Sequence, residues 1–147
     1  MTAMLQIAAA CLLLLAGCAG APPRLLTGPP PSAAVVAHAA PPLAAGENIK
    51  PTELRRGEHA SLSLVQVRDR EAPHIHTRYD LTITLVRGTG TLWLDGVPLG
   101  MRPGDVAFIP RRMPHYFVND GAAPAMALVS FAPAFSGPDL APVSPVP

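Results

Sequence analysis

The chain has 147 residues, 19 prolines and a formal net charge of +1. Lys and Arg are scattered singly, apart from the adjacent pairs at 55–56 and 111–112, and no basic stripe with interleaved aromatic residues occurs. Nucleic-acid binding is therefore not expected. The chain has two cysteines, Cys11 and Cys18. Cys11 lies in a segment expected to be removed, so a disulfide framework is excluded in the mature protein.

An apolar run rich in Ala and Leu covers residues 5–17 and ends directly at Cys18. Such a run is short for a membrane span and typical of the core of a secretory signal. The tetrapeptide at 15–18, Leu-Ala-Gly-Cys, resembles the lipobox of bacterial lipoproteins. That resemblance implies cleavage before Cys18 and lipidation of its thiol. The usual basic start is missing, because residues 1–6 contain no Lys or Arg, and the alternative is an ordinary signal peptide with an incidental cysteine.

The lipobox resemblance makes residues 1–18 a signal peptide and the mature chain an exported protein with an N-terminal lipid anchor in the membrane. Ala19 follows the cysteine where aspartate would favour inner-membrane retention. By the same resemblance, the expected location is the cell envelope, on the periplasmic side of the outer membrane.

Proline-rich stretches flank the rest of the chain. Residues 19–50 are rich in Ala and Pro, and residues 137–147 contain four prolines. Proline fixes φ and removes a hydrogen-bond donor, so the first stretch is expected to be a disordered, extended tether. The second is expected to lie over the domain surface or to fray. One domain is predicted between them, over residues 51–136.

The predicted domain reads as all-β, because short apolar runs alternate with Gly, Pro and Asp turn signals. Residues 81–85 alternate strictly between apolar residues and Thr, as a half-buried strand requires. Strands are predicted at 60–67, 81–86, 91–94, 105–109, 116–118 and 125–131. This pattern predicts a sandwich or small barrel. The expected interior residues are Leu62, Leu64, Ile83, Leu85, Trp93, Phe108, Phe117, Leu128 and Phe131.

Three histidines carry the strongest functional signal. Residues i and i+2 of a strand point to the same face, so His74 and His76 should lie side by side. His115, from a distant strand, can complete three corners of a metal site inside a barrel.

The segment around His115 resembles the second sequence motif of the cupin family. Gly104 is followed after five residues by Pro110, then by His115, and three residues later by Asn119. Arg112 stands where the family usually has glycine. His74, His76 and Gly88 resemble the first motif, but no glutamate follows the histidines, and Arg68 replaces the leading glycine. Together the two motifs cover about residues 57–136.

The cupin resemblance implies a single jelly-roll β-barrel that holds a divalent metal ion (Fe, Mn, Zn or Ni) through His74, His76 and His115. Asp80 is the expected fourth ligand, provided that a bulge turns it inward. By strand alternation, Tyr79 and Tyr116 should point away from the metal. Cupin barrels often dimerise, so a homodimer is also an expectation.

The resemblance leaves the function open among three classes. The first is a metal-dependent enzyme of the dioxygenase, isomerase or decarboxylase type, acting on a small molecule. The second is a non-catalytic module that binds a metal or small ligand at the envelope. It is favoured by the lack of a clear general acid or base beyond the ligands. The third is a structural protein with a vestigial site.

Overall fold

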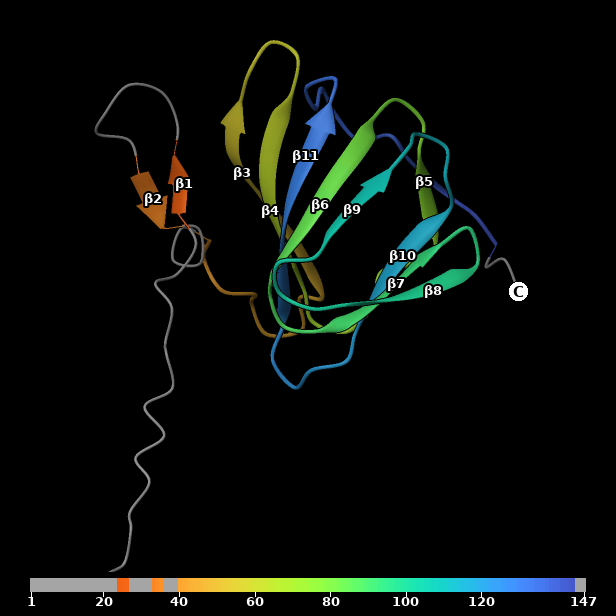
Figure 1. The fold of residues 1–147 in the computed structure, drawn as a ribbon. Coiled ribbons are helices and arrows are strands. Elements are labelled where there is room, and N and C mark those ends of the chain that lie inside the picture. Colours follow the sequence, from red (N-terminus) through yellow and green to blue (C-terminus); the bar gives the residue numbers. More distant parts are fainter. Residues whose placement is uncertain (1–23, 27–32, 36–39, 145–147) are drawn as a thin grey trace, which may run out of the picture.

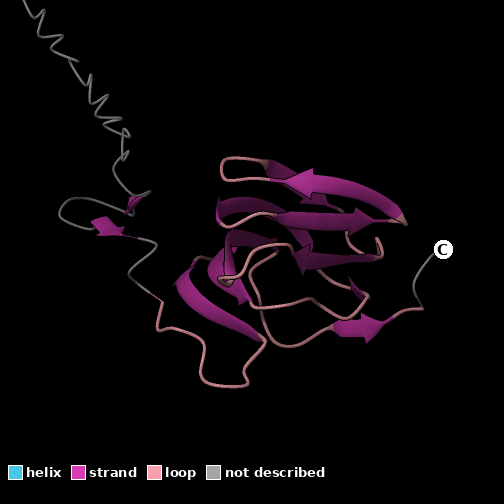
Figure 2. Cartoon of the chain, turned by 90° about the horizontal axis from the view of Figure 1, so that it is seen from below, coloured by secondary structure: helices cyan, strands magenta, loops and turns pink. Residues whose placement is uncertain are grey.

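The computed structural model describes residues 24–26, 33–35 and 40–144, and all regular elements in these ranges are β-strands (Figures 1 and 2). Accordingly, the described residues include no helix that is long and apolar enough to cross a membrane. The expected signal segment and Cys18 lie outside the described residues. Near the N-terminus, β1 (Arg24–Leu26) and β2 (Ala33–Val35) pair with each other as a separate two-stranded sheet.

Two five-stranded antiparallel sheets form the domain, as expected for a jelly roll (Figure 1). The first sheet has the order β3 (Ile49–Arg56), β4 (Ser61–Val67), β11 (Ala125–Ala132), β6 (Asp80–Arg87) and β9 (Val106–Ile109). The second has the order β12 (Leu140–Pro142), β5 (His74–His76), β10 (His115–Asn119), β7 (Gly90–Leu94) and β8 (Val97–Met101). The all-β prediction is confirmed, and six predicted strands match β4, β6, β7, β9, β10 and β11 to within one residue at each end.

The main core contains inward-facing residues of both sheets. Leu85, Phe117 and Phe131, all predicted to be interior, are buried there, and Ile83 packs against them. Leu64 is also buried, but it belongs to a second cluster, with Leu128 packed against that cluster. Leu54 of β3 also packs against this second cluster, so the edge strand contributes to its burial.

Three of the predicted interior residues, Leu62, Trp93 and Phe108, lie outside both core clusters. Phe108 is 61% exposed, while its neighbour Ile109 is fully buried. Successive side chains of a strand point to opposite faces, so burial of Ile109 turns Phe108 outward. Trp93 is half-buried and stacks in parallel on Tyr116, with 5.7 Å between ring centroids.

Candidate metal centre

The three histidines meet across two neighbouring strands of the second sheet. His74 and His76 lie on the same side of β5, and His115 of β10 is paired directly with His74 in the ladder. The ring centroid of His74 lies 4.3 Å from that of His115 and 5.3 Å from that of His76. One ring nitrogen from each residue lies within 4.8 Å of the other two. His76 and His115 are buried, with 7% and 4% exposure. The structure thus brings together the three predicted histidines.

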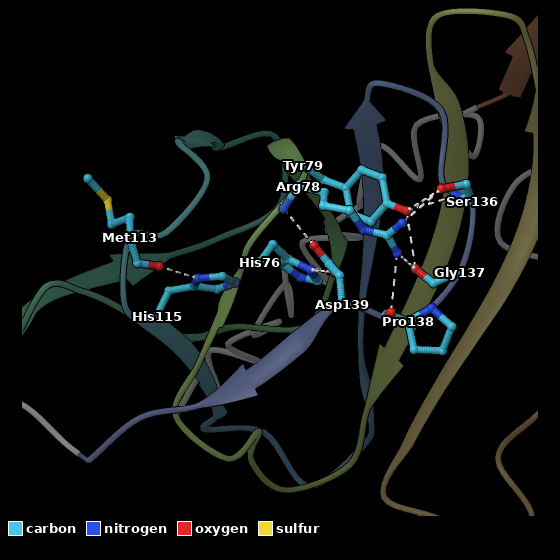
Figure 3. A network of polar contacts seen from close by, with 9 residues as sticks. All are labelled: His76, Arg78, Tyr79, Met113, His115, Ser136, Gly137, Pro138 and Asp139. Carbon is cyan, nitrogen blue, oxygen red and sulfur yellow. Dashed lines mark hydrogen bonds and ion pairs between the residues drawn. The ribbon is translucent and has the colours of Figure 1, made fainter.

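The hydrogen bonds to the Nδ1 atoms determine which nitrogens are free. His74 Nδ1 lies 2.8 Å from the carbonyl oxygen of Ala72. His115 Nδ1 lies 2.9 Å from the carbonyl oxygen of Met113, as Figure 3 shows. A carbonyl oxygen only accepts, so Nδ1 must carry the proton and donate it. In a neutral imidazole the other nitrogen, Nε2, then has a free lone pair. Both rings therefore present the form that can bind a metal ion.

His76 is oriented by a carboxylate from the C-terminal segment, Asp139. Its Nδ1 lies 2.8 Å from Asp139 Oδ1, while Oδ2 accepts a hydrogen bond of 2.9 Å from the Arg78 backbone N–H (Figure 3). Burial alone would raise the pKa of the Asp139 carboxyl group, but these hydrogen bonds hold it below its usual value. The ionised carboxylate accepts the Nδ1 proton, so Nε2 is free on the third histidine as well.

Asp139 is supplied by the segment that was expected to lie over the surface or fray. This segment forms β12, which pairs with β5 and sets Leu140 opposite His76. The chain before it is held by Arg78, whose Nη2 donates to the Gly137 carbonyl oxygen at 3.0 Å. Tyr79 Oη donates to the same oxygen at 3.1 Å (Figure 3). The C-terminal segment is therefore part of the site.

Tyr79 does not point away from the histidines as expected. It is buried, and its ring centroid lies 6.3 Å from that of His76. A bend at residues 77–78 separates β5 from β6 and breaks the strand alternation on which the expectation rested. Tyr116, in contrast, points outward onto Trp93, as expected.

Asp80 does not join the three histidines. Its Oδ1 accepts hydrogen bonds from the Arg111 backbone N–H at 2.8 Å and from Arg111 Nε at 3.1 Å. Its Oδ2 lies 2.9 Å from Arg111 Nη2. The Arg111 guanidinium lowers the pKa of Asp80 to about 2. The irregularity in the β6–β11 pairing lies opposite Met126 and Ala127, far along β6 from Asp80, so no bulge turns this carboxylate inward.

The imidazoles of His76 and His115 are held neutral by burial. Burial lowers the pKa of His115 to about 4, although its hydrogen bond to the Met113 carbonyl opposes the shift. Burial also lowers the pKa of His76, against the raising effect of Asp139. A protonated imidazole cannot bind a metal ion, so these shifts keep the ligands available in weakly acidic solution.

The lowered pKa of His115 predicts a loss of stability in acid. Between its usual pKa of 6.5 and about 4, the unfolded chain binds a proton at this residue and the folded chain does not. Stability therefore falls as pH falls through this window, by about 3 kcal/mol for this residue. Glu71, whose pKa is raised by burial, acts in the opposite direction. Urea unfolding with a chelator at pH 7 and pH 4.5 should show that His115→Asn loses less stability than the wild type, and an equal loss would contradict the assignment.

Comparisons with known proteins agree with this geometry. Residues 61–131 match the family model described as "Cupin domain". An uncharacterized protein of Aquifex aeolicus is 34% identical over 93 residues, which are 63% of this chain and 76% of that protein.

Solved structures with the same fold are more distant in sequence. A Klebsiella pneumoniae protein with a double-stranded beta-helix domain is 19% identical, with a TM-score of 0.63 over 74% of this chain and 94% of that one. Streptomyces PAC13, solved with uridine, is also 19% identical, with a TM-score of 0.57 over 68% and 82% of the two chains. At this identity the likeness shows the fold alone.

Proposed function

The chain belongs to the cupin superfamily, and on that premise we propose that His74, His76 and His115 bind one divalent metal ion that serves a reaction on a small molecule. Two observations carry the proposal: one ring nitrogen from each histidine lies within 4.8 Å of the other two, and each Nδ1 has a hydrogen-bond partner that leaves Nε2 free. Three imidazoles with further positions open suit Zn, Fe, Mn or Ni. The donor set thus fits such an ion without a fourth protein ligand.

The site adjoins a cavity that can admit a small molecule. This cavity has a volume of about 510 Å³, and His74 and His76 form part of its wall. A bound ion would act as a Lewis acid on an oxygen of the substrate. The hydrogen bonds at Nδ1 orient the three imidazoles, and burial holds those of His76 and His115 neutral. Apolar side chains make up most of the cavity wall.

The competing function is a non-catalytic module that binds a metal or small ligand. The predominance of apolar side chains in the cavity wall favours it, because few groups there can transfer a proton. The metal site is common to both functions, and the difference between them is turnover.

Metal analysis and a turnover screen test the proposal. The full chain with Cys18→Ser, dialysed after exposure to Zn²⁺, Mn²⁺, Fe²⁺ or Ni²⁺, is expected to retain one ion per chain. Oxygen consumption with iron and a panel of small oxygenated compounds then tests for reaction. Full loading without turnover would favour the binding module, and failure to retain any of the four ions would refute the metal site.

We also propose that the mature chain is anchored in the envelope by lipid on Cys18, with residues before it removed. The support is the lipobox-like tetrapeptide at 15–18. Metabolic labelling with a fatty acid should label the wild type and leave Cys18→Ser unlabelled, and membrane fractionation would locate the anchored protein. A wild-type chain without label would refute the anchor.

A further inference from the structure

Most of the side chains that line the 510 Å³ cavity are apolar. Apolar side chains from both sheets and the C-terminal segment line it, among them Val65, Phe131, Phe135 and Leu140. The polar members are Ser63, Glu71, His74 and His76, and no Lys or Arg is among the described residues of the wall. Glu71 is thus the one acidic residue among the described residues of the wall, and it has no Lys or Arg beside it there.

Glu71 is held in place by two hydrogen bonds with one residue of β10. Its backbone N–H donates to the Phe117 carbonyl oxygen at 2.9 Å, and its Oε2 accepts from the Phe117 N–H at 3.0 Å. This arrangement fixes both the backbone and the carboxyl group. Glu71 also lines a smaller cavity that it shares with Leu85 and Phe117 in the apolar core.

The second carboxyl oxygen of Glu71, Oε1, is free to meet a ligand. Among the described side chains, every fully buried oxygen or nitrogen has a hydrogen-bond partner, and the described residues provide none for Oε1. Oε1 is therefore accessible, and Glu71 borders both the 510 Å³ cavity and the smaller one. Burial raises the pKa of this carboxyl group, against the lowering effects of His74 and the Phe117 N–H.

The geometry points to Glu71 as the specificity-determining residue of this cavity, which binds an uncharged, mainly apolar small molecule whose hydroxyl group meets Oε1. A cavity of this size accommodates a small organic ligand. In the metal-free chain, an anionic ligand would enter a wall that offers it no Lys or Arg side chain and one acidic side chain. That the same ligand also reaches the metal centre, through His74 and His76 in the cavity wall, rests on the proposed function.

Three probes that share one ring test this assignment on the metal-free full chain with Cys18→Ser. Benzyl alcohol carries the hydroxyl group, toluene lacks it, and benzoate carries a negative charge. Titrations followed by NMR are expected to shift the signals of Ser63 and Val65 with benzyl alcohol. Benzoate should bind roughly tenfold more weakly or worse, because its charge would be buried without a partner. Absence of shifts at these residues with all three probes, or benzoate binding as tightly as the alcohol, would overturn the proposal.

Replacement of Glu71 separates its role from that of the cavity. Glu71→Leu should weaken benzyl alcohol binding by roughly three- to tenfold, the usual range for one hydrogen bond, and leave toluene binding unchanged. Equal losses for both probes would show that Glu71 only supports the fold. If Glu71→Leu fails to fold, the proposal is tested on the chain with Glu71 intact: benzoate must bind more weakly than benzyl alcohol there. The variant should still retain Co²⁺, because His74, His76 and His115 are intact, so a failure of the metal site would be seen separately from a loss of ligand binding.

Discussion

Replacing His115 with alanine is expected to weaken Co²⁺ and Zn²⁺ binding by a hundredfold or more. Four-ligand zinc sites bind with about 10–16 kcal/mol, so one ligand corresponds to roughly 3 kcal/mol, or about a hundredfold in affinity. His115 is the decisive residue because it alone comes from β10, and its loss leaves two histidines on one strand. Competition with a chromophoric chelator measures the affinity of each variant.

Two controls separate ligation from damage to the fold. His115→Gln fills most of the space of the buried ring without the imidazole, so it should lose metal affinity with less loss of thermal stability than His115→Ala. His59→Ala removes a surface histidine whose side chain is 88% exposed, and it should bind the metal as the wild type does. Wild-type affinity in His115→Gln would rule out the three-histidine centre.

The central strands could be predicted from the sequence because their alternation and turn signals are local. The three strands that were missed in the domain, β3, β8 and β12, all lie at sheet edges and all contain proline: Pro51, Pro98 and Pro142. Proline lacks the N–H that a central strand needs, but an edge strand has one side without a ladder. Proline-rich composition therefore placed β12 in an expected tail, whereas β3 begins at Ile49, in the last two residues of the expected tether, and runs on into the expected domain.

The three histidines could be predicted from the sequence for two reasons. The two-residue period of a strand places His74 and His76 on one face, and the cupin motifs contain all three histidines. Glu71 and Asp139 could not be predicted, because their roles depend on long-range placement. Asp139 is 63 positions from His76 and reaches it through the pairing of β12 with β5. Asp80 was the opposite case: it lies close to the histidines in sequence, but Arg111 binds its carboxylate outside the site.

Asp139→Asn is expected to weaken Co²⁺ binding by roughly 10- to 100-fold, the usual cost of losing the group that orients a histidine ligand. Asp139 accepts two hydrogen bonds, from His76 Nδ1 and from the Arg78 N–H. An amide has one oxygen, so its NH₂ group must face one of these partners. If it faces His76, it favours the ring form with the proton on Nε2, which cannot bind the metal. If it faces Arg78, it loosens the segment before β12.

Asp80→Asn is the matched control, because it makes the same chemical change at a carboxylate that Arg111 holds outside the site. It should leave Co²⁺ affinity unchanged. Long-range ¹H–¹⁵N NMR of the metal-free chain should show the His76 proton on Nδ1 in the wild type and in Asp80→Asn, and a shift toward Nε2 in Asp139→Asn. A merely structural role for Asp139 would lower thermal stability without moving this proton. An Asp80→Asn variant that loses affinity as Asp139→Asn does would instead return Asp80 to the ligand set.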